Sequence, residues 1–242
     1  MRPATYLDAM KQHQGRWIDK WSHYPKIYER HLAGYRDKPV RVLEIGVFHG
    51  GSLEVLARYL GPQASLVGFD IDPRCKAFET EQIAIEIGDQ GNAERLREVL
   101  DLHGPFDIII DDGSHFSAHM ILTHQLGWPH LRDGGVFMVE DTHSCYRHAF
   151  GGGWRAPQSF IEYSKLLVDD LHGLWQADPL LSTRPRYTLE LGSLHFYDSI
   201  VVMEKELRSS DPLRFRASAG FPSYPIPQPH EQEEARRNLH RL

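Results

Sequence analysis

The stretch Val40-Arg-Val-Leu-Glu-Ile-Gly-Val-Phe-His-Gly-Gly-Ser52 decides how the first part of the chain folds. It begins with a short apolar run, rich in β-branched side chains, that Gly46 ends. Runs of this kind are typical of buried strands. A helical pattern follows from Ser52 to Leu60, and Gly61-Pro62 ends it. The stretch therefore predicts a strand, a glycine-rich turn and a helix in succession.

The same alternation of strand and helix continues along the chain. Further strands are expected at 65–69, 84–87, 106–110 and 136–139, and helices at 92–102 and 117–131. Strands that alternate with helices predict a parallel sheet covered on both faces. Each expected strand ends in a glycine or an acidic residue, and ligands of open α/β sheets bind outside the carboxyl ends of the strands. The polar residues therefore fall where a binding site is expected.

The pattern changes towards the C-terminus. Segments 186–191 and 194–204 are expected to be strands joined by a tight connection at Gly192-Ser193, which makes an antiparallel hairpin. We predict an α/β fold with a Rossmann-like, doubly wound, mostly parallel seven-stranded sheet that this hairpin closes. The expected parts are an N-terminal helical cap segment at 1–38, the main domain at 39–208 and a Pro-rich tail at 209–242.

Composition and charge limit the classes of function. The chain has 242 residues, 41% of them hydrophobic, and a formal net charge of −6. Such a chain can build one substantial core, and its acidic balance argues against nucleic acid or an anionic membrane as partner. Cys75 and Cys145 form no CxxC pair, and neither a signal-peptide core nor a membrane-spanning apolar run is seen. A cytoplasmic protein is the expectation.

The first chemical signal is the glycine spacing after the first strand. It reads G-x-x-x-G-G and not G-x-G-x-x-G, which disfavours a pyrophosphate site. Glu44 precedes Gly46 by two residues, and an acid there suits a cationic part of a ligand, such as an amino group. The alternative is a strand-to-helix turn that needs glycine for its geometry alone.

Two further strand ends fit a nucleoside. Asp70 ends the second expected strand, where a carboxylate can accept both hydroxyl groups of a ribose. Asp89-Gln90 ends the third and can face an adenine ring. For Asp70 the alternative is an N-cap of the following helix, a common use of aspartate.

The more specific signal is a pair of acidic strand ends, in Asp107-Ile-Ile-Ile-Asp-Asp-Gly-Ser-His115 and Val139-Glu-Asp-Thr-His143. Neighbouring parallel strands lie about 4.8 Å apart, so carboxylates at their ends can share one ion. Oxygen ligands favour Mg²⁺ or Mn²⁺. We expect Asp112, Glu140 and Asp141 to be the metal ligands and Asp111 to turn towards the cofactor. The alternative is that these acids cap the helices that follow.

A general base is expected beside the metal. His115 lies three residues after Asp112, and a neutral imidazole can take the proton of a hydroxyl group that the metal has made more acidic. Its alternative role is a bond to backbone at the start of a helix. His143 is a second candidate near the metal.

The loop that follows, Cys145-Tyr-Arg-His-Ala-Phe-Gly-Gly-Gly-Trp-Arg155, mixes aromatic residues with glycines. Tyr146 and Trp154 are expected to contact the substrate, because an aromatic ring can stack on a sugar face and glycines let a loop close. The alternative is an ordinary surface loop or an oligomer contact.

Together these motifs, with Asp19-Lys-Trp-Ser-His-Tyr24 and Leu194-His-Phe-Tyr-Asp-Ser-Ile200, resemble the metal-dependent sugar O-methyltransferases of the class I S-adenosylmethionine type. These enzymes act on macrolide deoxysugars and mycobacterial saccharides, and proteins labelled cephalosporin hydroxylase are similar. An antiparallel hairpin is the usual end of their sheet. The resemblance covers roughly residues 40–205 and makes the main domain a methyltransferase domain. It implies that the cofactor is surrounded by Glu44, Gly46, Ser52, Asp70, Asp89 and Gln90.

The resemblance also implies roles for the remaining motif residues. Tyr24 and Tyr28 help cover the cofactor, and Tyr24 and His143 are expected near the substrate. Asp112, Glu140 and Asp141 match the residues that hold Mg²⁺ in this family, and His115 matches its general base. The expected function is methylation of a sugar hydroxyl by a homodimer or homotetramer. The alternatives are a catechol-type O-methyltransferase and an NAD-type oxidoreductase or non-catalytic cofactor-binding protein, which the missing G-x-G and the hairpin disfavour.

Overall fold

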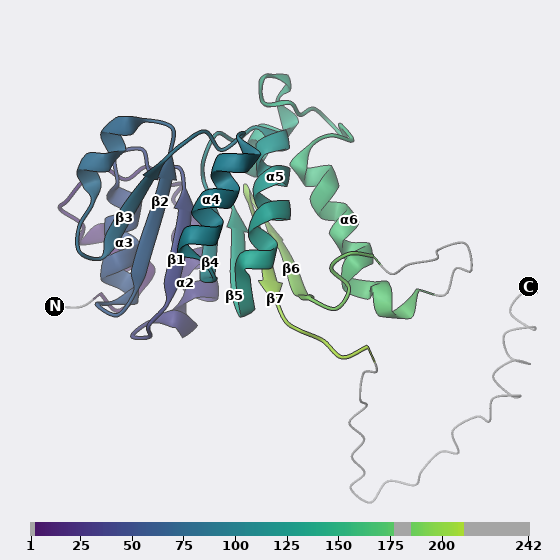
Figure 1. Cartoon of the computed structure of the whole chain (residues 1–242), viewed down its shortest axis with the longest axis horizontal. Helices are drawn as coiled ribbons and strands as arrows, with labels where there is room; N and C mark the ends of the chain where they lie inside the picture. The colour runs from purple at the N-terminus through teal and green to yellow at the C-terminus, as the bar shows by residue number, and fades with distance from the viewer. Residues whose placement is uncertain (1–2, 177–184, 211–242) are drawn as a thin grey trace, which may run out of the picture. The chain divides into compact units, whose positions relative to one another are not determined.

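The computed structural model describes residues 3–176 and 185–210, so nearly all of the expected tail at 209–242 lies outside the described residues. One seven-stranded sheet, in the order β3-β2-β1-β4-β5-β7-β6, forms its centre (Figure 1). The strands are β1 (Arg41–Ile45), β2 (Ser65–Asp70), β3 (Ile83–Ile87), β4 (Phe106–Asp111), β5 (Leu131–Val139), β6 (Leu191–Tyr197) and β7 (Ile200–Lys205). The helices are α1 (Tyr6–Lys11), α2 (Tyr24–Leu32), α3 (Gly51–Leu60), α4 (Ala93–His103), α5 (Ser117–Gly127) and α6 (Phe160–His172), with short 3₁₀ turns between them.

The predicted sheet is confirmed. Strands β1 to β5 pair in parallel, and β7 pairs antiparallel with both β5 and β6. Strand order reverses at β1 and β4, whose carboxyl ends lie side by side because Ile45 is in register with Asp111. Ligands of doubly wound sheets bind at such a reversal. The topology therefore brings the predicted acidic strand ends to one edge of the sheet.

The hairpin forms, but its predicted register is wrong. The turn lies at Asp198-Ser199, where Ser199 has a φ of 64°, and not at Gly192-Ser193. Gly192 lies inside β6, at an irregularity of the ladder between Leu191 and Ser193. The segment 186–190 is not a strand. A two-residue hairpin turn needs positive φ, which Ser199 supplies, whereas the glycine marks a bulge within the strand.

Helix α6 was not predicted from the sequence. The Ser159 side chain accepts a hydrogen bond from the backbone N–H of Glu162 and so caps the helix. One face of the helix buries Phe160, Ile161 and Leu167. The aromatic and glycine-rich segment 145–155 precedes this helix, and the sequence predicts a loop at this point.

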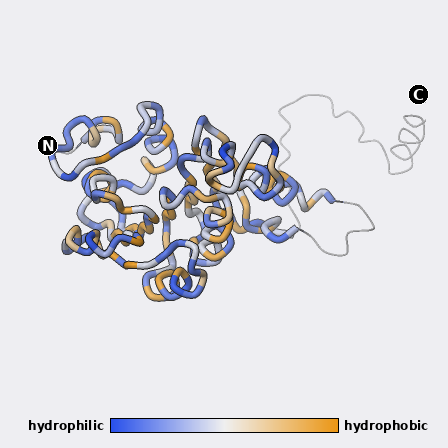
Figure 2. The backbone as a smooth tube through the Cα atoms, turned by 90° about the horizontal axis from the view of Figure 1, so that it is seen from above, coloured by the Kyte–Doolittle hydropathy of each residue, from blue (hydrophilic) through white to orange (hydrophobic). Residues whose placement is uncertain are grey.

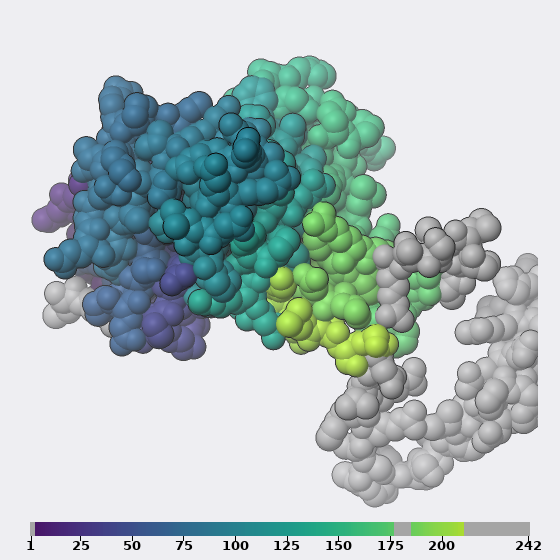
Figure 3. Space-filling model, in the orientation of Figure 1, coloured from purple at the N-terminus to yellow at the C-terminus, as the bar shows by residue number. Residues whose placement is uncertain are grey.

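Two apolar layers hold the sheet between helices. Alternate residues of β1 face opposite layers: Val42 packs with residues of α1, α2 and α3, and Leu43 packs with residues of α4, α5 and α6. Figure 2 shows hydrophobic and hydrophilic positions alternating along the backbone, as expected for elements with one buried face. Figure 3 shows α4 and α5, in teal, covering the near side of the sheet. Within the described ranges, no helix is long and apolar enough to cross a membrane.

The segment between α1 and α2 crosses the end of α3. A Cβ atom on Gly51, the first residue of α3, would lie 2.4 Å from the carbonyl oxygen of Trp17. The Glu54 carboxylate accepts hydrogen bonds from the backbone and the guanidinium of Arg16, at 2.9 and 2.7 Å. This close crossing fixes the next residues, from Asp19 to Tyr24, over the carboxyl ends of the strands.

The buried His124 of α5 should make the fold sensitive to acid. Its ring is 1% exposed, and burial lowers the pKa of its imidazole to about 3. Because the unfolded chain binds this proton below about pH 6.5 and the folded chain does not, stability should fall by up to about 1.4 kcal/mol per pH unit from there towards pH 3. His124→Phe should flatten this slope in urea titrations at several pH values. The exposed His148→Gln is the control, and an unchanged slope in His124→Phe contradicts the assignment.

Candidate active site

A cleft of about 1240 Å³ opens at the carboxyl ends of the central strands. The loop after β1, the ends of β2 and β3, the loop after β4 and the first residues after β5 line it. The segment from Asp19 to Tyr24 forms a further wall. Of the predicted site residues, the cleft is lined by Tyr24, Gly46, Asp70, Asp89, Gln90, Asp112, His115, Glu140, Asp141 and His143.

Lys20 lies between the carboxylates of Asp112, Glu140 and Glu44, and no role was predicted for it from the sequence. Its Nζ donates to Asp112 Oδ2 at 2.6 Å and to both oxygens of Glu140 at 2.9 and 2.8 Å. Glu44 Oε1 lies 4.0 Å away. The lysine side chain is 2% exposed. Its position within the Asp19–Tyr24 motif was the available signal, but a lysine among polar residues predicts a surface position.

Burial and charge set the ionisation of this group. Burial lowers the pKa of Lys20, but the carboxylates of Asp112, Glu140 and Glu44 outweigh it, so that the pKa is raised overall. Burial raises the pKa of Glu44 to about 7, and burial together with the charge of Asp112 raises that of Glu140. A buried carboxylate is stable only beside a cation, and the ammonium provides one positive charge for three acids.

Asp112, His115 and Asp141 form the second part of the site. Each offers one ligand atom, and the three atoms lie within 4.8 Å of one another. His115 Nε2 lies 3.7 Å from Asp141 Oδ2, and the Tyr24 hydroxyl donates to Asp141 Oδ1 at 2.6 Å. His115 and Asp141 have φ values of 58° and 50°. Such strained backbone in non-glycine residues clusters at functional sites.

The donor set fits a divalent cation. Two carboxylates and an imidazole converge, and the Nδ1 atoms of His115 and His143 are buried without a hydrogen-bond partner. Of the three predicted ligands, Asp112 and Asp141 lie in this cluster, while Glu140 is bonded to Lys20 and Tyr28. The carboxylate oxygens of Asp112, Glu140 and Asp141 suit Mg²⁺ or Mn²⁺, and the imidazole of His115 lies beside them.

The glycine turn and Asp70 shape the cofactor side of the cleft. A Cβ atom on Gly46, whose φ is 91°, would lie 2.0 Å from the carbonyl oxygen of Asp112, so only glycine lets the two loops approach. Asp70 Oδ2 accepts from the backbone N–H groups of Val47 and Phe48, at 2.7 and 3.0 Å. Asp70 therefore fixes the loop after β1 while it lines the cleft.

Gln90 links the third strand end to the fourth. Its Nε2 donates to Asp111 Oδ1 at 2.8 Å, and its Oε1 accepts from the Ser114 N–H at 2.8 Å. Burial raises the pKa of Asp111 to about 6. Asp111 thus faces Gln90, is buried and does not line the cleft, and its turn towards a cofactor stays a prediction. Asp89 accepts from the Gly91 N–H at 2.8 Å.

Three further predicted cofactor residues, Glu44, Ser52 and Tyr28, do not line the cleft. Ser52 Oγ donates to Glu44 Oε1 at 2.6 Å, and the Tyr28 hydroxyl donates to Glu140. Glu44 and Tyr28 are fully buried. In this arrangement they support Lys20 and Glu140, and their contact with a cofactor stays a prediction.

The aromatic residues that line the cleft are not those of the predicted substrate loop. Tyr146 and Trp154 are 47% and 79% exposed and do not line the cleft. Trp21 and Phe48, 56% and 59% exposed, do line it. Trp17, which is 64% exposed, has its ring centroid 5.8 Å from that of Phe48. We call Trp17, Trp21 and Phe48 the aromatic rim. The sequence did not predict this rim, because Phe48 lies far along the chain from Trp17 and Trp21.

Comparison with known proteins defines the class of the fold. Residues 43–142 match a family model described as a methyltransferase domain. The MycE methyltransferase from the mycinamycin biosynthetic pathway, in complex with Mg, SAH and mycinamycin VI, matches with a TM-score of 0.78 and 27% identity, over 97% of this chain and 60% of that one. The chain therefore contains a methyltransferase domain, as the hairpin and the strand ends predict. The match does not support an NAD-type oxidoreductase.

Curated relatives define the group more closely. An 8-demethyl-8-alpha-L-rhamnosyl tetracenomycin-C 2'-O-methyltransferase of Streptomyces olivaceus is 36% identical over 79% of this chain and 53% of its own length. The mycinamicin VI 2''-O-methyltransferase of Micromonospora griseorubida is 37% identical over 74% of this chain and 47% of its own length. The chain thus spans about half the length of these relatives. The predicted relationship to the sugar O-methyltransferases is confirmed.

Proposed function

We propose that the protein is an S-adenosylmethionine- and Mg²⁺-dependent O-methyltransferase that acts on a sugar hydroxyl of a saccharide or glycosylated natural product. The observation that carries the proposal is the convergence of Asp112, His115 and Asp141 in a cleft at the reversal of strand order. The names of the curated relatives, which methylate sugars of glycosylated natural products, support the substrate class.

Asp112, Glu140 and Asp141 would hold the metal. The ion, when bound, would orient a sugar hydroxyl and lower its pKa. Tyr24 supports Asp141 by donating to its Oδ1 at 2.6 Å, and Tyr28 donates to Glu140 from beneath. These tyrosines hold in place the two carboxylates that directly follow β5.

His115 would act as the general base. Its Nε2 faces Asp141 at 3.7 Å, which puts it beside a hydroxyl held at the same carboxylate. The imidazole would accept the proton of the sugar hydroxyl, whose oxygen would take the methyl group of S-adenosylmethionine as the bond between sulfur and that methyl group breaks and S-adenosylhomocysteine leaves. The Ser144 hydroxyl donates to the carbonyl oxygen of His115 at 3.0 Å and fixes this residue. His143, which also lines the cleft, would contact the substrate.

Asp70, Asp89 and Gln90 would bind the nucleoside part of the cofactor at the ends of β2 and β3. The Gly46 turn would let it approach the backbone. The aromatic rim would contact the sugar or its aglycone, because exposed rings at a cleft mouth bind flat apolar groups. Tyr146 and Trp154, whose ring centroids lie 6.0 Å apart, would reach the substrate only after the loop moves.

A labelled-methyl transfer screen tests the function. The purified chain is given labelled S-adenosylmethionine with saccharides, rhamnosylated polyketides and catechols, with Mg²⁺ or with EDTA. Transfer to a glycoside that EDTA abolishes is expected. Transfer to the catechols alone would favour the alternative substrate class. Transfer that EDTA leaves unchanged would show that the reaction needs no metal.

Asp141→Asn should abolish the response to Mg²⁺. Asparagine tolerates the positive φ of 50° at this position, so the backbone is preserved while the negative charge is lost. Methyl transfer should fall by at least about 100-fold, since a bound metal contributes several kcal/mol. Mn²⁺ titration followed by electron paramagnetic resonance measures the binding itself. The exposed Asp169→Asn is the control, and unchanged Mn²⁺ affinity in Asp141→Asn would contradict this ligand.

Trp21→Ala should impair substrate binding selectively. Loss of one aromatic contact of about 0.5–1.5 kcal/mol should raise the KM for a glycoside by roughly 2- to 10-fold and leave the affinity for S-adenosylmethionine unchanged. Steady-state kinetics and cofactor titration separate the two effects. Trp175, which is 66% exposed and does not line the cleft, supplies the control Trp175→Ala. An unchanged KM in Trp21→Ala removes this side chain from the substrate site.

We also propose that the protein works in the cytoplasm as a homodimer or homotetramer. Cys75 and Cys145 are free and buried, which fits a reducing compartment. Light scattering after gel filtration measures the oligomeric state directly.

A further inference from the structure

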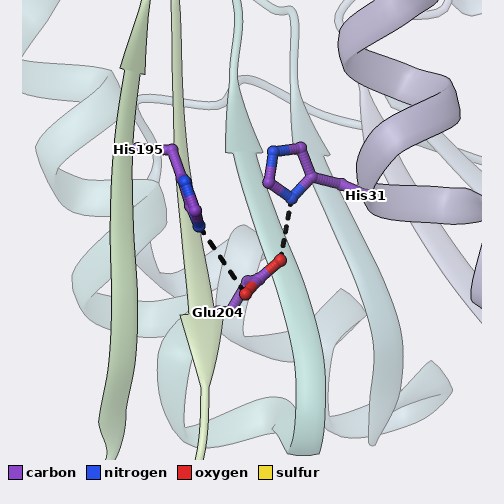
Figure 4. A group of neighbouring side chains, drawn as sticks. All are labelled: His31, His195 and Glu204. Atoms are coloured by element: carbon purple, nitrogen blue, oxygen red, sulfur yellow. Dashed lines mark hydrogen bonds and ion pairs between the residues drawn. The ribbon is translucent and has the colours of Figure 1, made fainter.

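A second cluster of metal-ligating side chains lies where α2 packs against the C-terminal hairpin. It consists of His31 on α2, His195 on β6 and Glu204 on β7, and we call it the hairpin cluster (Figure 4). Each residue offers one ligand atom, and these atoms lie within 4.8 Å of one another. None of the three lines the active-site cleft.

The carboxylate of Glu204 lies between the two imidazoles. His31 Nδ1 is 2.8 Å from Glu204 Oε1, and His195 Nε2 is 3.7 Å from Glu204 Oε2. The imidazole centroids lie 4.8 Å apart and the rings meet edge to face. Separations between ligand atoms of about 3–4 Å suit one ion with metal–ligand bonds of about 2.0–2.2 Å.

Tyr197 and Ser193 contact the ligand residues and orient His31 and Glu204. The Tyr197 hydroxyl lies 2.9 Å from His31 Nε2, the nitrogen that faces away from Glu204. Ser193 Oγ lies 2.9 Å from His195 Nε2 and donates to Glu204 Oε2 at 2.7 Å. A ligating histidine almost always has its other nitrogen held as Tyr197 holds that of His31, because the contact fixes the tautomer and the ring. Ser193 lies instead at the nitrogen of His195 that would bind the ion, so it orients Glu204 and its contact with His195 Nε2 must open when the ion binds.

The cluster is charged and accessible. Its hydrogen bond with His31 lowers the pKa of Glu204 to about 2, so the carboxylate is ionised at neutral pH. His31 and Glu204, with Tyr35, Gly192 and Ser193, line a cavity of about 540 Å³, and the side chain of His195 is 30% exposed. An ion can therefore enter, and water can complete its coordination.

We propose that His31, His195 and Glu204 form a second metal site, which binds a transition-metal ion of the Zn²⁺ type. Two imidazoles and one carboxylate are a donor set that Zn²⁺ favours, whereas the acid-rich cleft favours Mg²⁺. The ion bonds to His31 Nδ1, His195 Nε2 and one oxygen of Glu204. Both histidines must be neutral, so the Nδ1 proton now given to Glu204 leaves, and the remaining proton of His31 lies on Nε2 towards Tyr197.

This site ties the helix that supports the active site to the edge of the sheet. Helix α2 also carries Tyr24 and Tyr28, which donate to Asp141 and Glu140. An ion that fixes His31 to β6 and β7 therefore holds the helix from which both tyrosines reach the cleft. Its role is structural, and it does not depend on the proposed reaction.

Isothermal titration of the metal-free full chain with Zn²⁺ tests the site. The double variant Asp112→Asn/Asp141→Asn removes ligands of the cleft, so Zn²⁺ bound by that variant reports the hairpin cluster. One Zn²⁺ per chain is expected there. Adding His195→Ala or Glu204→Gln to that double variant should weaken this binding by at least about 100-fold, since each removes one of three ligands. Co²⁺ bound by the double variant should give the visible absorption of a tetrahedral site.

Thermal unfolding supplies a second measurement. Zn²⁺ should raise the Tm of the double variant but not that of its His195→Ala derivative, whose partly exposed side chain can be truncated without a core cavity. The proposal is overturned if the double variant binds no Zn²⁺. It is also overturned if binding survives both His195→Ala and Glu204→Gln, because the cluster is then only a hydrogen-bonded contact between helix and hairpin.

Discussion

His115→Ala is expected to lower kcat for methyl transfer by about 10²–10⁴-fold, the usual contribution of a positioned general base. The imidazole lies 3.7 Å from Asp141, beside the expected position of the hydroxyl group, while the residues proposed to bind the nucleoside lie on other strand ends. The affinity for S-adenosylmethionine should therefore stay unchanged. Single-turnover transfer of labelled methyl and calorimetric titration of the cofactor measure the two quantities.

A second variant at His115 is needed, because its backbone has a positive φ. Its φ of 58° is unfavourable for alanine, and His115→Asn keeps a residue that tolerates this conformation. Both variants should lose activity alike if the imidazole takes the proton. His143→Gln tests the second candidate, because His143 also lies by Asp141, at 4.0 Å. Full activity in His115→Asn together with loss of activity in His143→Gln would identify His143 as the general base.

Lys20→Met should destabilise the metal-free protein by about 3–5 kcal/mol, the usual effect of removing one partner of a buried ion pair. The substitution fills a similar volume but leaves Asp112, Glu140 and Glu44 without the ammonium that lies 2.6 to 4.0 Å from them. A divalent cation at the same carboxylates supplies that charge. Mg²⁺ should therefore raise the stability of Lys20→Met more than that of the wild-type protein.

Urea unfolding with Mg²⁺ or with EDTA measures this difference. Lys205→Met is the control, because Lys205 is 8% exposed and its Nζ lies 3.2 Å from Glu190, away from the cleft. That variant should be destabilised without rescue by Mg²⁺. Equal stability of Lys20→Met and wild type in EDTA would mean that the three acids are neutral, and would contradict the charged cluster.

Local sequence predicted most of the elements correctly. The apolar run that ends in Asp111-Asp112 and the glycine turn after β1 identify strand ends, because alternation and breaking residues act over a few positions. The hairpin register failed because Gly192 serves equally as a turn or as a bulge, and only pairing with β7 decides between them. The meeting of Asp112 with Asp141 was expected because neighbouring parallel strands must end side by side, whereas the bond of Glu140 to Lys20 was not expected.

Sequence alone determined the class of fold and the oxygen-rich chemistry at the ends of β4 and β5, since both depend on spacing along the chain. Tertiary structure alone decided that Lys20 lies among these acids, that Trp21 and Phe48 line the cleft while Tyr146 and Trp154 do not, and that His31 meets His195 and Glu204. The reason is that these contacts join residues as many as 173 positions apart, as in His31 and Glu204, and no local pattern specifies which distant side chains share a buried space.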